Sequence, residues 1–195
     1  TFFRTNLEEG RYRNAESQHF GLALALIEQR KFKQARQQIS RLLKQHPQEP
    51  VFVIFDSRLK AMTGKLSSAI SSLEKNAKLL ADNYSINMQL AELYIQAEQY
   101  DKAVNLLQLI TLLRPYDEQV YKRLAEAAGK NKNLAIAHAY QADYLYLNGQ
   151  LEAAIKQLEI ALRQDSIDFY LSSKLEAKLQ NLQAEFKILK ASKEK

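Results

Sequence analysis

The sequence predicts an all-α fold built from stacked helical hairpins, and two observations carry that prediction. The first is a fixed internal period, because alanine recurs at one constant interval, at Ala35, Ala69, Ala103 and Ala137. The second is composition, because five glycines and three prolines in 195 residues leave little room for loops or strands. A fixed period of roughly 20 to 50 residues is typical of one supersecondary unit stacked on copies of itself.

Other positions repeat together with these marker alanines. A large apolar residue stands three positions earlier in each unit, at Phe32, Leu66, Tyr100 and Leu134. A small residue stands twelve positions earlier, at Ala23, Ser57, Ala91 and Ala125. Two antiparallel helices that touch closely need small side chains where they cross and a bulky neighbour beside the crossing. The pattern and its period of about 34 residues therefore predict a right-handed solenoid of tetratricopeptide repeat (TPR) units with a C-terminal end helix.

A fifth alanine departs from the regular spacing. Ala154 follows Ala137 after only half a period, which corresponds to one helix with its turn. Leu151, Gly149 and Ala142 stand at the offsets expected around Ala154. We therefore expect the helix around Ala137 to serve twice, as the second helix of one hairpin and the first helix of the next.

The register also gives the domain organisation. We expect a linker from a preceding domain over residues 1–14, a TPR domain over 15–190 and a frayed tail over 191–195. The units should cover about 16–49, 50–83, 84–117 and 118–150, then 151–165 and an end helix at 167–190. Their helices should run at about 16–29, 32–45, 50–63, 66–80, 84–97, 100–113, 117–129, 133–147 and 151–164. Because the chain begins at Thr1 without a signal peptide, we interpret it as a fragment of a longer protein.

The end helix is marked by one apolar stripe. The stripe consists of Leu171, Leu175, Leu179, Leu182, Phe186 and Leu189. A helix with one apolar face at the end of a repeat array shields the last repeat from water.

Motifs for catalysis or metal binding are absent from the sequence. There is no cysteine, no H-E-x-x-H and no phosphate-binding G-x-x-x-x-G-K. The three histidines, His19, His46 and His138, have no metal-ligand spacing. We expect a non-catalytic domain that binds no metal and no other cofactor.

The net charge of +6 raises the question of nucleic acid. Residues 1–50 hold nine Lys or Arg against five Asp or Glu, and the remaining residues hold 19 against 17. The early basic residues are Arg30, Lys31, Lys33, Arg36, Arg41 and Lys44. We interpret them as a solvated outer helix face, so neither nucleic acid nor a membrane span is expected.

The remaining candidate is the concave face, which the first helix of each unit lines. The candidate protein-binding groove consists of Phe20, Leu24, Ile27, Ile54, Arg58, Met88, Glu92, Ile95 and Lys122. Its front is apolar and favours an apolar protein or peptide segment. Only Arg58 and Lys122 could meet a terminal carboxylate, so a ligand of that class is not expected. The alternative is that Phe20, Leu24 and Ile27 simply pack on the N-terminal segment.

Several segments resemble a narrower family. They are residues 17–26 (SQHFGLALAL), 32–36 (FKQAR), Leu42 and Leu43 before Pro47, residues 137–149 (AHAYQADYLYLNG) and residues 174–183 (KLEAKLQNLQ). Together with the half-period step and the end helix, they resemble the repeat region of periplasmic zinc metallopeptidases of the beta-barrel assembly-enhancing protease type. The likeness covers residues 15–188.

This resemblance implies a function that the residues alone do not give. In that family a zinc peptidase domain precedes the repeats, so zinc is expected only in that domain, which lies outside this sequence. The resemblance implies a periplasmic module that docks on its own upstream protease domain and recruits outer-membrane assembly clients. The alternative is a free-standing TPR adaptor with unrelated protein partners.

Overall fold

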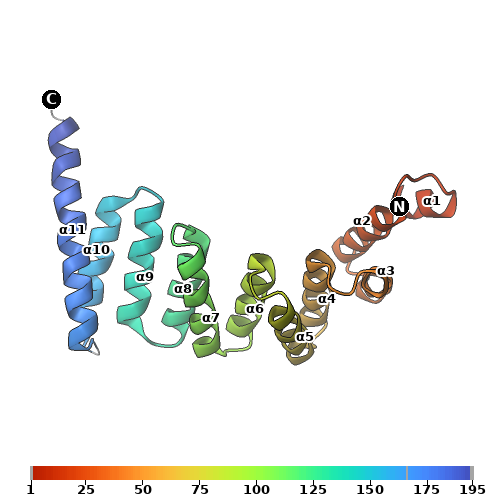
Figure 1. The fold of residues 1–195 in the computed structure, drawn as a ribbon, viewed down its shortest axis with the longest axis horizontal. Coiled ribbons are helices and arrows are strands. Elements are labelled where there is room, and N and C mark those ends of the chain that lie inside the picture. Colours follow the sequence, from red (N-terminus) through yellow and green to blue (C-terminus); the bar gives the residue numbers. More distant parts are fainter. Residues whose placement is uncertain (1, 166, 194–195) are drawn as a thin grey trace. The chain divides into compact units, whose positions relative to one another are not determined.

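The computed structural model describes residues 2–165 and 167–193, which form eleven α-helices and no strand (Figure 1). The helices are α1 (Phe2–Glu8), α2 (Ala15–Glu28), α3 (Phe32–Gln45), α4 (Pro50–Met62), α5 (Leu66–Leu79), α6 (Tyr84–Gln96), α7 (Tyr100–Leu113), α8 (Glu118–Lys130), α9 (Leu134–Leu147), α10 (Leu151–Leu162) and α11 (Phe169–Lys193). The predicted all-α fold is confirmed. For α2 to α10 the predicted bounds agree within two residues, and α11 begins two residues and ends three residues later than predicted.

The chain divides into two compact units, one up to Leu93 and one from Tyr94. In the first unit α2 pairs with α3, α4 pairs with α5, and α1 packs on α2. In the second unit α8, α9, α10 and α11 lie side by side in chain order (Figure 1). Helix α9 contacts both α8 and α10, which confirms that it serves two hairpins.

Every hairpin of the array is closed by the same turn. One residue between the paired helices has a positive φ in each case: Arg30, Gly64, Glu98, Lys132 and Gly149. The first four follow one another at the interval of the marker alanines, and Gly149 follows Lys132 after half of it. At each turn this residue donates its N–H to the carbonyl three positions earlier, as Glu98 does to Ile95 at 3.1 Å. Two of the five turns use glycine, which adopts this left-handed conformation without a steric cost.

Most of the marker alanines are buried where paired helices cross. Ala35, Ala69, Ala103 and Ala154 are fully enclosed. The repeat register predicts that these alanines and Ala137 all lie buried at helix crossings. Ala137 is only half-buried, so this prediction is wrong for Ala137. The buried residues of α9 are Ala135, Ala139 and Ala142. They form the stripe expected when α9 acts as the first helix of the hairpin with α10. Ala142 stands twelve positions before Ala154, at the small-residue position of the crossing with α10.

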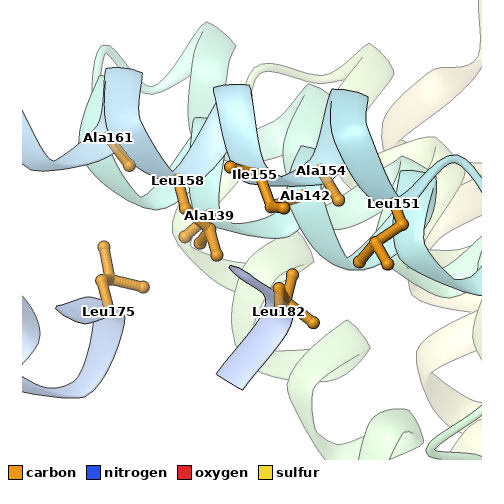
Figure 2. Packing of buried hydrophobic residues seen from close by; sticks show 9 residues of the cluster. All are labelled: Ala139, Ala142, Leu151, Ala154, Ile155, Leu158, Ala161, Leu175 and Leu182. Carbon is orange, nitrogen blue, oxygen red and sulfur yellow. The ribbon is translucent and has the colours of Figure 1, made fainter. Parts of the chain in front are cut away.

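The end helix α11 packs on α10 through the predicted stripe. Leu175 and Leu182 are buried, and Figure 2 shows Leu175 beneath the Leu158–Ala161 end of α10 and Leu182 near Leu151. Leu171, Leu179 and Phe186 pack against the same core while partly exposed. Two polar contacts tie α11 to α9: the Lys178 ammonium pairs with the Asp143 carboxylate, and the Tyr146 hydroxyl donates to Glu185 at 3.1 Å.

The helix at the start of the chain packs on the first hairpin. A Cβ added at Gly21 would lie 2.4 Å from the Phe3 ring, so α1 approaches α2 at a point where only glycine leaves room. Asn6 of α1 donates to Gln18 of α2, and Arg4 donates to Gln34 of α3. Whether residues 1–14 also link this domain to a preceding one stays a proposal.

Candidate protein-binding surface

The front of the predicted groove is an aromatic cluster between α2 and α4. The ring of Phe20 lies 5.0 Å from the ring of Phe55, edge to face, and 5.6 Å from the ring of Phe52. Aromatic pairs at such distances contribute about 0.5 to 1.5 kcal/mol beyond the burial of their area. Phe20 is half-buried, so its contacts with α4 occupy part of the ring and leave part exposed.

Arg58 connects this aromatic cluster to α6. Its guanidinium lies 5.5 Å from the centre of the Phe55 ring, and its Nε donates to Oε1 of Gln89 at 2.6 Å. The guanidinium is thus held over an aromatic face, where the ring quadrupole attracts a cation. Gln89 is buried while Arg58 is exposed. The buried Gln89 therefore holds the Arg58 side chain in place, and the guanidinium remains accessible to a ligand.

The other predicted groove residues of the first unit differ in exposure. Leu24, Ile27, Met88 and Glu92 are half-buried, and each keeps some surface. Ile54 is 9% exposed and belongs to the core. A charged residue at position 54 would therefore disturb the fold before it disturbed a partner.

Two predicted groove residues belong to the second unit. Ile95 is 3% exposed and packs in the core, whereas Lys122 of α8 is exposed. One turn beyond Lys122, Glu126 accepts from Arg123 at 3.0 Å and from Lys130 at 2.9 Å. The hydrogen bond from Lys130 lowers the pKa of Glu126, and partial burial opposes this shift. This part of α8 is a charged surface rather than an apolar one.

The alternative prediction, that Phe20, Leu24 and Ile27 pack on the N-terminal segment, is partly confirmed for Phe20 and Ile27. Phe3 and Leu7 of α1 pack against the same buried cluster as Phe20 and Ile27, which is centred on Leu22, Leu26 and Ile39. Packing with α1 and α4 therefore takes up some of the apolar surface that the sequence assigned to a partner.

Sequence reasoning missed Phe52, Phe55 and Gln89, which shape the candidate site. Gly21, Phe55 and Gln89 follow one another at the interval of the marker alanines, so they occupy one repeat position. In each case that position touches a neighbouring element. A comparison of the residues at this repeat position, Gly21, Phe55 and Gln89, would have predicted that it contacts a neighbouring helix.

The early basic residues, which were predicted to form a solvated outer helix face, are exposed. A shallow cavity of about 550 Å³ on α3 is lined by Lys33, Arg36, Arg41 and Lys44 together with Gln37 and Ser40. His46 contacts Glu16 at 2.7 Å, and over residues 2–165 and 167–193 no three His, Asp or Glu side chains are gathered as a metal site. In the same residues no helix combines the length and apolarity needed to cross a bilayer.

The repeated hairpins, their common turns and the end helix define a tetratricopeptide repeat domain. The family model for the tetratricopeptide repeat matches residues 61–127. A domain of this kind is a protein-interaction scaffold and not a catalyst.

The chain is similar in sequence to the beta-barrel assembly-enhancing protease. It is 28% identical to the protein of Escherichia coli (strain K12) over 182 residues, which are 92% of this chain and 37% of that protein. It is 26% identical to the protein of Yersinia pestis over 176 residues, or 90% of this chain and 36% of that protein. The chain therefore spans little more than a third of the length of these relatives.

Solved structures show the same fold at low sequence identity. MamA from Desulfovibrio magneticus RS-1 superposes with a TM-score of 0.61 at 14% identity, over 87% of this chain and 96% of that one. A thermophilic TPR protein of Thermus thermophilus gives a TM-score of 0.52 at 18% identity, over 85% of this chain and all of that one.

Proposed function

We propose that this domain is the non-catalytic TPR part of a periplasmic zinc metallopeptidase that acts in outer-membrane protein assembly. Its role is to dock on the protease domain and to recruit client proteins. The observation that carries the proposal is the similarity to the assembly-enhancing protease, because it extends over 92% of the chain and covers the irregular half-period step as well as the regular repeats.

We assign binding to the inward face of the first unit, where Phe20, Leu24, Ile27 and Met88 each expose some apolar surface. Arg58 lies over the Phe55 ring, which contacts Phe20. An extended or helical apolar segment would cover these side chains, and burial of apolar area contributes about 25 cal/mol per Å². Arg58 would fix the register of the segment, since its guanidinium is already held by Phe55 and Gln89.

The second candidate is a free-standing adaptor of the same fold. It is favoured by the structural likeness to TPR proteins, which is independent of any protease. The gene sequence upstream of Thr1 separates the two candidates. An H-E-x-x-H motif in a preceding domain is expected for the peptidase module, and an open reading frame without that motif would leave the adaptor as the function.

A further inference from the structure

Helix α3 carries a positive charge in its first turn, where two other second helices of the array carry a negative one. Lys33 stands two residues before the marker alanine of α3, and Asp101 of α7 and Glu152 of α10 stand at the same repeat position. The positive N-terminal end of the helix dipole stabilises an acidic side chain in the first turn and disfavours a cation. Lys33 therefore opposes the preference of its own helix.

Arg36 is a second departure from the repeat. It directly follows the marker alanine of α3 and is exposed. Ile70 of α5 and Ile155 of α10 stand at the same repeat position and are only 5% and 8% exposed. Packing fills this position with an apolar side chain in those helices, so packing does not account for an arginine in α3.

Ser40 is a third departure, because it replaces an acidic residue. Five residues after the marker alanine, α5 has Glu74 and α10 has Glu159. Helix α3 has Ser40 there, and it contains no Asp or Glu between Phe32 and Gln45. Like charges three or four residues apart destabilise a helix, whereas opposite charges stabilise it. The cations of α3 thus repel one another without an acidic neighbour on the same helix.

The four cations of α3 surround a neutral polar floor. Lys33, Arg36, Arg41 and Lys44 are all exposed, and they line the shallow cavity of about 550 Å³ together with Gln37 and Ser40. Because an α-helix turns by about 100° per residue, the two arginines lie on opposite sides of this floor and the two lysines lie toward its ends. The lysines are eleven positions apart, which corresponds to about 16 Å along the helix.

The chemistry of this face favours carboxylates. A guanidinium receives a carboxylate through two parallel hydrogen bonds, and α3 offers two of them. Helix α3 lies wholly within the described residues, and none of its large apolar side chains is exposed. It therefore presents neither an apolar anchor for a bilayer nor an aromatic ring on which a nucleic-acid base could stack. A length of about 16 Å matches about five residues of an extended segment.

We propose that the outer face of α3 is a second docking surface, which binds an acidic segment of a partner protein. The carboxylates of that segment pair with Arg36 and Arg41, and the lysines at the two ends add attraction along its length. Binding relieves the repulsion among the four cations. The proposal does not rest on the function proposed above, and it uses none of the residues assigned to the inward face.

The test uses the whole chain and a fluorescein-labelled peptide of alternating Glu and Ser with blocked ends. The control peptide has Gln in place of Glu. Binding is followed by fluorescence anisotropy at about 0.05 M and about 0.5 M sodium chloride, between which the Debye length falls from about 14 to about 4 Å. The chain carries either Arg36→Glu with Arg41→Glu, or Lys174→Glu with Lys187→Glu. The second pair changes two exposed residues of α11 and alters the net charge by the same amount.

We expect the acidic peptide to bind at low salt, and the control peptide to bind roughly tenfold more weakly or less. Arg36→Glu with Arg41→Glu should weaken binding by roughly tenfold or more, because two attractions become repulsions. High salt should have a similar effect. The α11 pair should leave binding within about twofold. Lys33→Glu with Lys44→Glu is a second variant of the same face and should also weaken binding, with circular dichroism to verify that each variant folds.

Absence of binding by the acidic peptide, or equal binding of the control peptide, would overturn the proposal. Equal losses in the α3 and α11 variants would also overturn it, because they would show attraction to the net charge and not to α3. A single-stranded oligodeoxynucleotide and phosphatidylglycerol vesicles test the class of partner. If either binds more tightly than the peptide at the same concentration of charge, and loses affinity in Arg36→Glu with Arg41→Glu, the surface serves that class and not an acidic protein segment.

Discussion

Nδ1 of His138 lies 2.8 Å from Oε1 of Gln157, and this pair repeats one found in the first unit. Nδ1 of His19 lies 2.8 Å from Oε1 of Gln38. The sequence separation of the partners is 19 in both cases, and each histidine stands at the same offset before its marker alanine, Ala154 or Ala35. Helices α9 and α10 therefore pack as α2 and α3 do, although α9 is also the partner of α8.

The two histidine–glutamine pairs should contribute equally to stability. Gln157→Ala and Gln38→Ala each remove one partly buried hydrogen bond, so each should lower the free energy of unfolding by about 0.5 to 1.5 kcal/mol. Urea unfolding followed by circular dichroism measures both. A neutral Gln157→Ala beside a destabilising Gln38→Ala would mean that α9 and α10 do not form a repeat hairpin.

Replacing Ala103 by leucine should overpack a helix crossing. Ala103 is fully enclosed, so the extra side chain must displace its neighbours at a cost of about 1 to 3 kcal/mol. Ala191→Leu on the exposed end of α11 is the control and should be nearly neutral. A thermal midpoint that Ala103→Leu leaves unchanged would contradict the repeat register.

Because Glu98 and Gly64 occupy the same position of the shared turn, substitutions at the two residues should change stability in opposite directions. Glu98 has a φ of 58° and Gly64 a φ of 77°. Glu98→Gly should stabilise the chain by about 0.5 to 1 kcal/mol because the strain of a left-handed side chain is removed, whereas Gly64→Ala should destabilise it by about 1 kcal/mol. Differential scanning calorimetry reports both midpoints, and shifts of the same sign would contradict the common turn.

The contact between Phe3 and Gly21 gives a test of how α1 is held. Gly21→Ala gains roughly 1 kcal/mol of helix propensity in α2 but places a methyl group against the Phe3 ring. We expect faster amide exchange in residues 2–8 of Gly21→Ala, as in Phe3→Ala, while α2 keeps its protection. Unchanged exchange of α1 in both variants would show that this contact does not hold it.

The alanine period was sufficient to predict nearly every helix boundary, because each unit meets the same packing demand at the same positions. The half-period step at Ala154 was readable for the same reason. The partial exposure of Ala137 could not be predicted from the sequence, because α9 contacts two partner helices and its sequence, LAIAHAYQADYLYL, is apolar on most sides. A helix without a single apolar face does not reveal which stripe lies deepest.

The candidate site was predictable only in part. The sequence identified the inward positions by register, but register does not tell how far a neighbouring side chain covers them. Phe52 and Phe55 cover Phe20, and the core encloses Ile54 and Ile95. Helix α1 was not expected because no period marks residues 1–14.

The most direct test of the proposed function is a titration of the chain at low and high salt. The ligands are the zinc peptidase domain of an assembly-enhancing protease and an unfolded outer-membrane barrel segment. The variants are Phe20→Glu and Leu24→Glu on the inward face and Arg36→Glu on the outer face of α3, with circular dichroism to verify folding.

We predict that both inward variants lose affinity and that Arg36→Glu does not, with binding little changed by salt, since burial of apolar area is weakly screened. If Arg36→Glu abolishes binding while Phe20→Glu and Leu24→Glu leave it intact, and the affinity falls steeply with salt, the inward face is not the binding site.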